Sequence, residues 1–385
     1  MARSSRPCKA QNAKPVVAGL LAATLLITGC ADTAYLVGSA TGHLKILQAA
    51  RPVDDWLADE QTPAALKQRL QLAQEIRRFA VDHLHLPDNA SYQRYVQLQR
   101  RAVVWNVVAA PPYSLTLKTW CFPVTGCVGY RGYFDEQEAK HEADVLRAQG
   151  LEASVYGVPA YSTLGWMNWL GGDPLLSTFI QYPQGELARM VFHELAHQVV
   201  YVKDDTAFNE SFATAVERLG SAAWLARQAN PAVQAEYAGF DARRRAFRAL
   251  TAQTRMRLRA LYADNRPTDG AVQEAMKQAA YADFRRAYAQ LKQGWGGQGP
   301  YDAWVANANN ATFGALASYD DWVAAFEALF ARQPGNWRAF YAAVNQLAAL
   351  PRAERTSRLQ QLLGSEVAGT ECYSMDNVKP LRDEG

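Results

Sequence analysis

An excess of charge of either sign is missing from most of this chain. The 385 residues carry a formal net charge of +3. Four basic residues and no acidic residue fall within the first 29 positions, and beyond them 36 basic side chains face 37 acidic ones. The positive balance therefore belongs to the N-terminus, and the composition offers no argument for nucleic-acid binding.

Long apolar runs are scarce as well. The run at residues 16–27 has twelve residues, which is too short to cross a membrane comfortably as a helix. It follows a basic segment and ends in Leu26-Ile27-Thr28-Gly29-Cys30, which resembles the bacterial lipobox. We expect residues 1–29 to be a signal peptide and Cys30 to become an acylated anchor. The alternative is an ordinary signal peptide with an incidental cysteine.

The residue after Cys30 is Ala31. In lipoproteins that resemble this chain, an aspartate at that position favours retention at the inner membrane. Its absence implies an outer-membrane protein of a bacterial cell envelope, facing the periplasm.

Cysteine is also rare, with five residues in the chain. Cys121 and Cys127 flank a turn that contains proline and glycine, and an exported compartment favours oxidation. A local disulfide is therefore expected, and a second metal site is the weaker alternative because no histidine lies nearby. Cys372 is left over, to compete for either partner or to stay free.

The length and a hydrophobic content of 49% suffice for one large domain or two modest ones. Runs rich in β-forming residues occur at residues 102–108, 113–117 and 153–166, and a helix is expected at residues 134–149. After residue 220 the pattern is helical. We therefore predict a predominantly helical α+β fold, with an α+β region at residues 30–220 and a helical region at residues 221–385.

The motif that dominates the chain is His193-Glu194-Leu195-Ala196-His197. On a helix, a spacing of four residues places both imidazoles on one face, where they can share one Zn²⁺ ion. Glu194 lies about 100° round the helix and can reach a zinc-activated water as general base. No proline or glycine interrupts a helix at residues 186–201. The alternative is a pair of ordinary histidines on a helix face.

A catalytic zinc ion needs a third protein ligand. No histidine follows His197, and the metzincin positions hold Val200 and Lys203, so that pattern is excluded. Glu210 fits better, in a second helix expected at residues 206–219 with Gly220 as its stop. A carboxylate that favours the helix dipole is the alternative for Glu210.

These residues carry a resemblance. The segment at residues 209–213, Asn-Glu-Ser-Phe-Ala, is similar to the segment that supplies the third zinc ligand in gluzincin aminopeptidases. The interval of twelve residues after His197 is shorter than in that family, and Thr214 stands where an acidic residue is common. More specifically, the chain resembles bacterial lipoproteins described as predicted zinc-dependent aminopeptidases. The matching pieces are CVGYRGYF, YSTLGW, DPLLST, HELAHQ, FNESFA and NNA.

The zinc chemistry requires a donor for the oxyanion and a surface that holds the substrate backbone. A tyrosine is expected as the donor, with Tyr319 preferred over Tyr301 because it follows the NNA segment. The substrate backbone is expected along an edge strand at Ser162, Thr163, Leu164 and Gly165, as in gluzincin-like sites. A plain core strand is the alternative for this segment.

The motif and the resemblance together predict a zinc metallopeptidase that acts on peptides or proteins, with aminopeptidase activity favoured. No residue identifies itself as the anchor for the substrate's α-ammonium group, and Asp173 and Glu186 are only guesses. A zinc endopeptidase of envelope proteins and a non-catalytic zinc-binding scaffold are the alternatives. Glu194 argues against the scaffold, because a structural site needs no general base.

Seven arginines crowd residues 243–259. A solvated helix face is the expected explanation for them, in preference to a binding patch.

Overall fold

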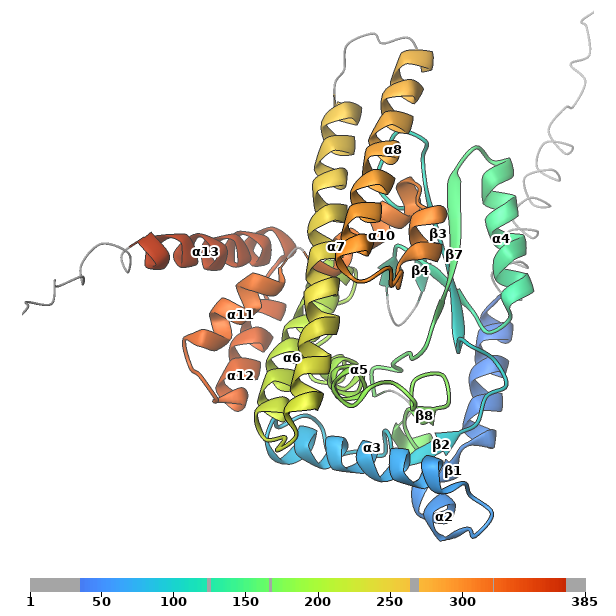
Figure 1. The fold of residues 1–385 in the computed structure, drawn as a ribbon, viewed down its shortest axis with the longest axis vertical. Helices are drawn as coiled ribbons and strands as arrows, with labels where there is room; N and C mark the ends of the chain where they lie inside the picture. The colour runs from blue at the N-terminus through green and yellow to red at the C-terminus, as the bar shows by residue number, and fades with distance from the viewer. Residues whose placement is uncertain (1–34, 123–125, 166–167, 264–269, 321, 372–385) are drawn as a thin grey trace, which may run out of the picture. The chain divides into compact units, whose positions relative to one another are not determined.

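The computed structural model describes residues 35–371, except for residues 123–125, 166–167, 264–269 and 321 (Figure 1). The chain separates into two compact units, residues 1–48 and residues 49–385. In the first unit, the described residues 35–48 are helical. The expected signal peptide, Cys30 and Cys372 lie outside the described residues. Within the described part of the chain, no helix is both long enough and apolar enough to cross a membrane.

The second unit is mostly helical and contains three small sheets, which confirms the expected α+β class. Its first sheet has the order β1-β2-β8, with β1 antiparallel and β8 parallel to the central strand. Two helices accompany this sheet, and the second of them follows Pro63 and buries its apolar face. The elements are β1 (Arg51–Pro52), β2 (Arg94–Val96), β8 (Leu175–Leu176), α2 (Val53–Ala58) and α3 (Ala64–Asp82).

The second sheet is antiparallel, with the order β6-β3-β7. Its central strand is almost entirely buried because α4 and α10 (Asn310–Asp320) both pack against it. The side chain of Asp135 caps α4 by accepting hydrogen bonds from two backbone amides of the first turn. The elements are β3 (Val104–Ala110), β6 (Arg131–Tyr133), β7 (Glu152–Val158) and α4 (Glu136–Ala148).

Two of the expected strands need correction. Residues 113–117 form no strand, because α10 covers them so closely that a Cβ on Gly314 would lie 2.5 Å from the Leu115 carbonyl oxygen. The strand expected at residues 153–166 ends at Val158, since Pro159 has no amide hydrogen for the ladder. The segment at residues 161–165 is irregular, and Leu164 and Gly165 both adopt positive φ.

A two-stranded hairpin, β4 (Trp120–Phe122) and β5 (Gly126–Val128), carries a disulfide between Cys121 and Cys127. The hairpin reaches the turn before α6 (Thr206–Ala226), where the backbone amide of Cys127 donates to Oδ1 of Asp204 at 2.5 Å. Gly126 faces the same residue, and a Cβ there would lie 2.3 Å from that oxygen. The disulfide hairpin therefore lies against the connection between two helices that are central to the fold.

Those two helices are α5 (Gln184–Ala196) and α6 (Thr206–Ala226), which pack closely together. The prediction that the first helix continues to residue 201 is wrong, because the chain turns after Ala196. The prediction that Gly220 ends the second helix is also wrong. A Cβ on Gly220 would lie 2.7 Å from Leu84 and 3.0 Å from Phe192, so this glycine permits close packing inside a continuous helix.

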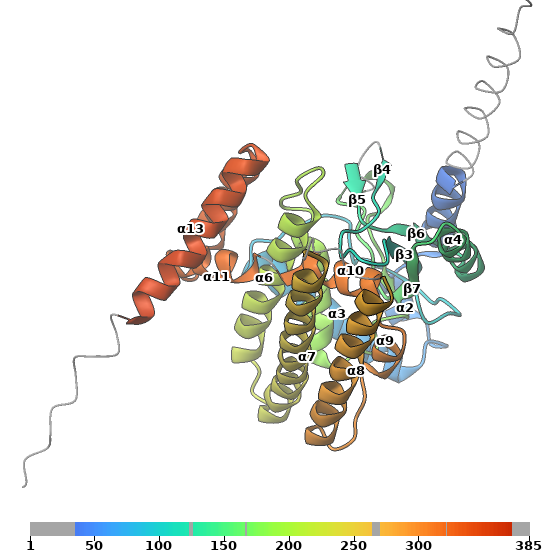
Figure 2. The same cartoon turned by 90° about the horizontal axis from the view of Figure 1, so that it is seen from above.

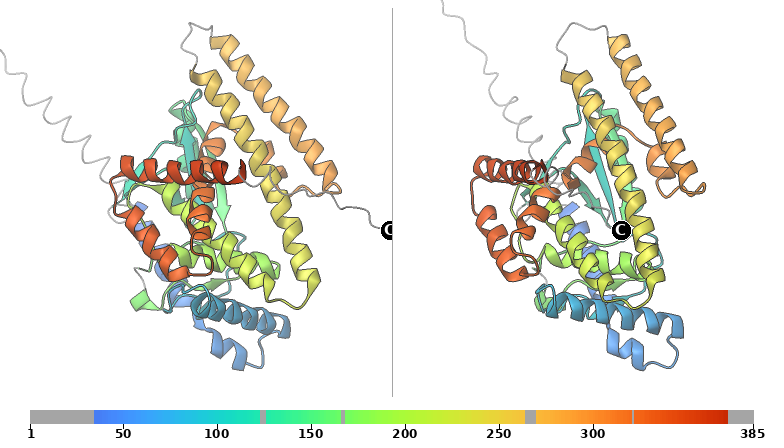
Figure 3. Two further views of the ribbon diagram at one scale, coloured as in Figure 1. Left: turned by 90° about the vertical axis from the view of Figure 1, so that its left-hand side faces the viewer. Right: turned by 60° about the vertical axis from the view of Figure 1, so that its left-hand side comes forward.

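The rest of the second unit is helical, as expected. Two long helices lie side by side (Figures 1 and 2), and the three helices at the C-terminal end pack together and against α6 (Figure 3). An aromatic cluster that includes Phe247, Phe284 and Phe313 fills the space between the long pair and α10. The helices are α7 (Pro231–Ala263), α8 (Gly270–Gly294), α9 (Asp302–Ala306), α10 (Asn310–Asp320), α11 (Val323–Ala331), α12 (Trp337–Ala348) and α13 (Arg352–Glu371).

The side chain of Asn310 connects this helical part to the sheet. It is fully buried, and its Oδ1 accepts hydrogen bonds from the hydroxyls of Tyr262 and Tyr281 at 2.8 and 2.6 Å. Its Nδ2 donates to the carbonyl oxygens of Pro111 and Pro112. Asn310, the second asparagine of the NNA segment, therefore holds the start of α10 in place.

Candidate metal centre

Hydrogen bonds from side chains hold the connection between α5 and α6 in place. The side chain of Asn209 accepts a hydrogen bond from the Val202 amide at 2.7 Å and donates one to the Val202 carbonyl at 2.8 Å. Asp205 caps α6 by accepting from the Phe208 amide at 3.2 Å. These bonds fix the direction in which α6 begins, and the residue that follows Asn209 is Glu210.

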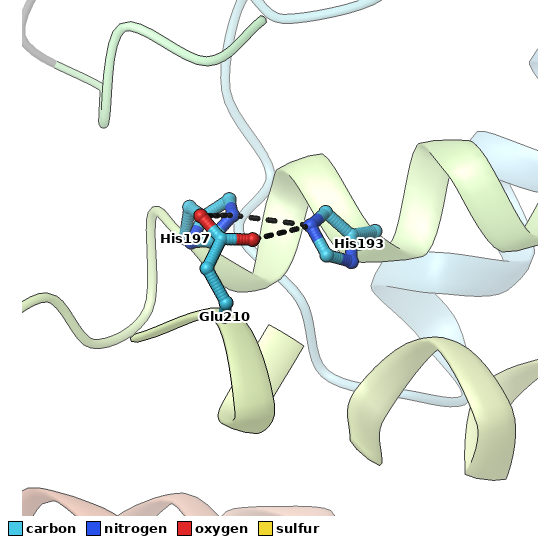
Figure 4. A group of neighbouring side chains, drawn as sticks. All are labelled: His193, His197 and Glu210. Atoms are coloured by element: carbon cyan, nitrogen blue, oxygen red, sulfur yellow. Dashed lines mark hydrogen bonds and ion pairs between the residues drawn. The ribbon is translucent and has the colours of Figure 1, made fainter. Parts of the chain in front are cut away.

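His193, His197 and Glu210 meet at one point between the two helices (Figure 4). Nε2 of His193 lies 3.2 Å from Nε2 of His197 and 3.4 Å from Oε2 of Glu210. The distance from Nε2 of His197 to Oε1 of Glu210 is 3.8 Å. All three side chains are at most 13% exposed. Two imidazole nitrogens and one carboxylate thus form a group that can hold a metal ion.

A second glutamate supports this group and was not predicted from the sequence. Oε2 of Glu217 lies 2.8 Å from Nδ1 of His193, on the side of the ring that faces away from Glu210. Glu217 is almost fully buried and receives two further hydrogen bonds from Nη1 of Arg189, at 3.0 and 2.9 Å. Such a partner fixes the ring orientation and leaves Nε2 free to bind metal.

The only sign of this residue in the sequence is its position seven residues after Glu210, which places it on the same face two turns later. His197 differs from His193 in this respect. Its Nδ1 is buried and has no hydrogen-bond partner among the described residues. The two histidines are therefore held in different ways, His193 by hydrogen bonding and His197 by packing.

Burial dominates the acid–base properties of the group. It raises the pKa of Glu194 to about 7; the nearby charge of His193 opposes this shift, and the charge of Glu210 adds to it. Burial also lowers the pKa of His197 to about 4. For His193, burial acts in the same direction, but hydrogen bonds with Glu210 and Glu217 outweigh it and raise the pKa to about 10. Glu194 therefore has a proton affinity suited to exchange near neutral pH.

The segment expected to hold the substrate wraps around Asp173 instead of forming a strand. The amide and hydroxyl of Thr163 donate to the Asp173 carboxylate at 3.0 and 2.7 Å, and Ser162 does so at 3.4 Å. Gln198, which follows His197, donates to the same carboxylate at 3.3 Å. The loop that contains Leu164 and Gly165 is thus bonded, through Asp173, to the residue beside the metal centre.

The two acidic residues considered as anchors for an α-ammonium group both have internal partners. Asp173 accepts the four hydrogen bonds just described and is 2% exposed. Glu186 binds Arg189 and Arg244 at 3.2 and 2.5 Å. Neither carboxylate is presented to a ligand in this arrangement.

The structure describes only one of the two tyrosines expected as the oxyanion donor. Tyr319 lies in α10, and its side chain is outside the described part of the structure. Tyr301 stacks on Phe247 at a centroid distance of 3.9 Å, within the aromatic cluster. Tyr130 and Tyr201 were not singled out, yet burial and the negative charge of Glu210 raise the pKa of both hydroxyls. Neither residue belongs to a helix or strand: Tyr130 lies in the short connection between β5 and β6, and Tyr201 lies in the connection between α5 and α6.

Comparison with known proteins places the chain in a family. No curated protein and no solved structure matches it. The model of a protein family described as "Putative aminopeptidase" matches residues 34–359, a range that includes the metal centre, Glu194 and Glu217. Because the match covers most of the chain, this protein belongs to that aminopeptidase family.

Proposed function

We propose that this protein is a zinc-dependent peptidase in which His193, His197 and Glu210 hold the ion. The donor geometry supports zinc. Ligand atoms at about 2.0–2.1 Å from a tetrahedral ion lie about 3.3–3.4 Å from one another. The three separations here are 3.2, 3.4 and 3.8 Å. Two imidazoles and one carboxylate are also a ligand set of catalytic zinc sites, which keep a further position for water or substrate.

When bound, zinc lowers the pKa of water and polarises the carbonyl of a scissile peptide bond. Glu194 is the proposed general base. It takes the proton from the attacking water and returns it to the leaving amine, a task that favours a pKa near the working pH. The pKa of about 7 that burial gives to Glu194 supports this role. Glu217 keeps the Nδ1 proton of His193 in place, so that Nε2 remains the ligand atom.

A tyrosine hydroxyl is proposed to donate a hydrogen bond to the developing oxyanion. Tyr319 is the residue proposed from the sequence. Tyr130 is a second candidate, since the charges of Glu210 and Glu194 both act on its hydroxyl. Replacing each tyrosine by phenylalanine distinguishes the two candidates. The variant that lacks the true donor should show a kcat about 10²- to 10³-fold lower, and the other variant should keep the wild-type kcat.

Aminopeptidase activity is the form of the reaction that family membership favours. An endopeptidase of envelope proteins would use the same residues, and a zinc-binding scaffold would use only the ligands. Free amino-terminal reporters and blocked, internally quenched peptides distinguish these functions. The aminopeptidase cleaves only the first kind, the endopeptidase cleaves the second, and the scaffold cleaves neither.

The proposed location is the bacterial cell envelope, with acylated Cys30 anchoring the protein in the outer membrane and its peptidase part facing the periplasm. The lipobox-like sequence supports this location. So does the Cys121–Cys127 disulfide, because disulfides persist in the periplasm and are rare in the cytosol. Metabolic labelling with a fatty acid, compared between wild type and Cys30→Ala, tests the anchor.

The decisive experiment uses protein that begins after Cys30, as wild type and as Glu194→Gln. We expect one zinc per chain in both, peptide cleavage by the wild type, and a loss of kcat of about 10²- to 10⁴-fold in the variant. Equal turnover by both proteins would remove Glu194 from the mechanism. Zinc binding without any cleavage would support the scaffold instead.

A further inference from the structure

A row of charged side chains leads away from the metal centre toward α7. It begins with Glu217, which contacts His193, and continues through Arg189 to Glu186 and Arg244. Arg189 donates from Nη1 to both oxygens of Glu217 and from Nε to Oε2 of Glu186 at 3.2 Å. Nη2 of Arg244 lies 2.5 Å from Oε1 of Glu186. Charges of opposite sign alternate along the whole row.

All four side chains are largely withdrawn from water. Their exposed fractions are 2% for Glu217, 17% for Arg189, 12% for Glu186 and 14% for Arg244. Burying an ion pair carries a desolvation cost that its attraction repays only with good geometry and further hydrogen bonds. Here each interior member of the row has a partner on both sides. Such an arrangement is costly as a means of stability and well suited to fixing orientations.

The geometry at Glu217 shows what is being oriented. Nη1 of Arg189 contacts both oxygens of this carboxylate, and Nε of the same planar guanidinium is held by Glu186, so the position of Nη1 is fixed and limits rotation of the carboxylate. Oε2 of Glu217 is the atom that accepts from Nδ1 of His193. Arg189 therefore limits the rotation of the group that sets the ring plane of His193. Among the residues that the structure describes, none supports Nδ1 of His197 in this way, so the precision of the centre depends on His193.

The far end of the row explains part of the arginine-rich segment. Arg244 belongs to α7, and it also contacts Asp241 at 3.2 Å on its own helix. The expectation of a solvated face is thus wrong for Arg244, which turns inward, while Arg245 is 61% exposed. Through Glu186, Arg244 limits the freedom of Arg189 from a helix that contributes no metal ligand.

We propose that Arg189 is a positioning residue of the metal centre, which orients His193 through Glu217 and is itself held by Glu186 and Arg244. This inference rests on the proposed metal site. It predicts that affinity for zinc depends on side chains that never touch the ion, in the order of their distance along the row: Arg189 first, then Glu186 and Arg244.

The test measures zinc affinity of the metal-free protein by competition with a chromogenic chelator, and thermal unfolding of the same samples. The variants are Arg189→Met, Arg189→Lys, Glu186→Gln and Arg244→Met. Loss of a partner that orients a ligand typically costs 10- to 100-fold in metal affinity. We expect a loss of that size for Arg189→Met and a loss of about 3- to 10-fold for Glu186→Gln and Arg244→Met.

Arg189→Lys keeps the charge but lacks the planar pair of donors. Compared with Arg189→Met, the lysine variant should restore most of the unfolding temperature of the metal-free protein but little of the zinc affinity. Arg245→Met is the matched control for Arg244, because it removes an exposed arginine from the next position of α7. Its zinc affinity should stay within about twofold of wild type.

The outcomes are distinct. If Arg189→Met folds and binds zinc as tightly as wild type, the positioning role is wrong while the proposed function stands. If the row variants lower the unfolding temperature but their folded fraction binds zinc as tightly as wild type, the row is structural only and the inference is overturned. If wild type itself binds no zinc, the proposed function fails first, and the inference fails with it.

Discussion

Arg355 of α13 donates two hydrogen bonds to Oδ2 of Asp205, from Nε at 3.0 Å and from Nη2 at 2.8 Å. Both side chains are buried. The other oxygen of Asp205 caps α6, five residues before Glu210. The last described helix is therefore bonded to the turn at which α6, the helix that carries Glu210, begins.

Replacing Arg355 by methionine would leave Asp205 buried without its cationic partner. Breaking a buried pair from one side typically costs about 3–5 kcal/mol. We expect a loss of that size in the free energy of unfolding, measured by urea denaturation of the metal-free protein. Arg358→Met, which removes an exposed arginine from the same helix, should change it by less than about 0.5 kcal/mol. Similar losses in both variants would mean that the pair has no special importance.

Zinc should stabilise the folded protein. A ligand that binds only the native state adds about 2.7 kcal/mol at a concentration 100 times its dissociation constant. We therefore expect the unfolding temperature of chelator-treated protein to rise on addition of zinc. The rise should disappear in His197→Ala and Glu210→Gln, which each remove one proposed ligand. Calorimetry with and without zinc measures it, and an equal rise in these variants would place the ion elsewhere.

Asp173 provides a prediction about pH. Burial, the largest influence, raises the pKa of its carboxyl above the ordinary value, against hydrogen bonds from Thr163, Ser162 and Gln198 that lower it. The folded state thus holds the proton more tightly than the unfolded state does. Its contribution to stability is full below the unfolded pKa of about 4 and is lost as pH rises through the folded value.

In Asp173→Asn the side chain at this position does not titrate. The variant should therefore be destabilised most, relative to wild type, in acid, and the difference should shrink as pH rises toward neutrality. Lost hydrogen bonds to Thr163 and its neighbours leave a destabilisation of about 1–3 kcal/mol even there. Denaturation curves of both metal-free proteins between pH 4 and pH 7 test this, and a difference that grows with pH would contradict it.

The close contact at Gly220 predicts opposite effects for two alanine substitutions. In Gly220→Ala the new methyl group would meet Leu84 and Phe192 in the core, and overpacking of this kind costs about 1–3 kcal/mol. In Gly239→Ala, within α7, the nearest atom would be 3.7 Å away on the flexible side chain of Arg243. That change should stabilise the protein by about 0.5–1 kcal/mol. Stabilisation by both substitutions would show that Gly220 is not needed for packing.

Local patterns in the sequence predicted which residues form the candidate metal centre, because spacing along one helix decides whether side chains can meet. His193 and His197 are one turn apart, and the polar residues after Lys203 require a turn that starts a new helix. Glu210 follows from the same local reasoning. The predominance of helix and the presence of small sheets also follow from residue periodicity.

Features that depend on how elements pack could not be predicted. Glu217 reaches His193 only because α5 and α6 lie at a particular angle, and Arg244 reaches Glu186 from 58 residues away. Gly220 looked like a helix stop because propensity rules take no account of a neighbouring helix that needs the space. Residues 113–117 have the composition of a strand, but α10 covers them instead of a neighbouring strand.

The residues of the candidate metal centre lie close together in the sequence. His193, His197, Glu210 and Glu217 fall within 25 consecutive residues on two adjacent helices. The entropy lost on closing a loop grows with its length, and local contacts form early in folding. The four groups can come together before Arg355, whose partner lies 150 residues away, finds its place. On the proposed function, the side chains that hold zinc can thus assemble before the last helix docks, and an ion bound to them would stabilise this early part of the fold.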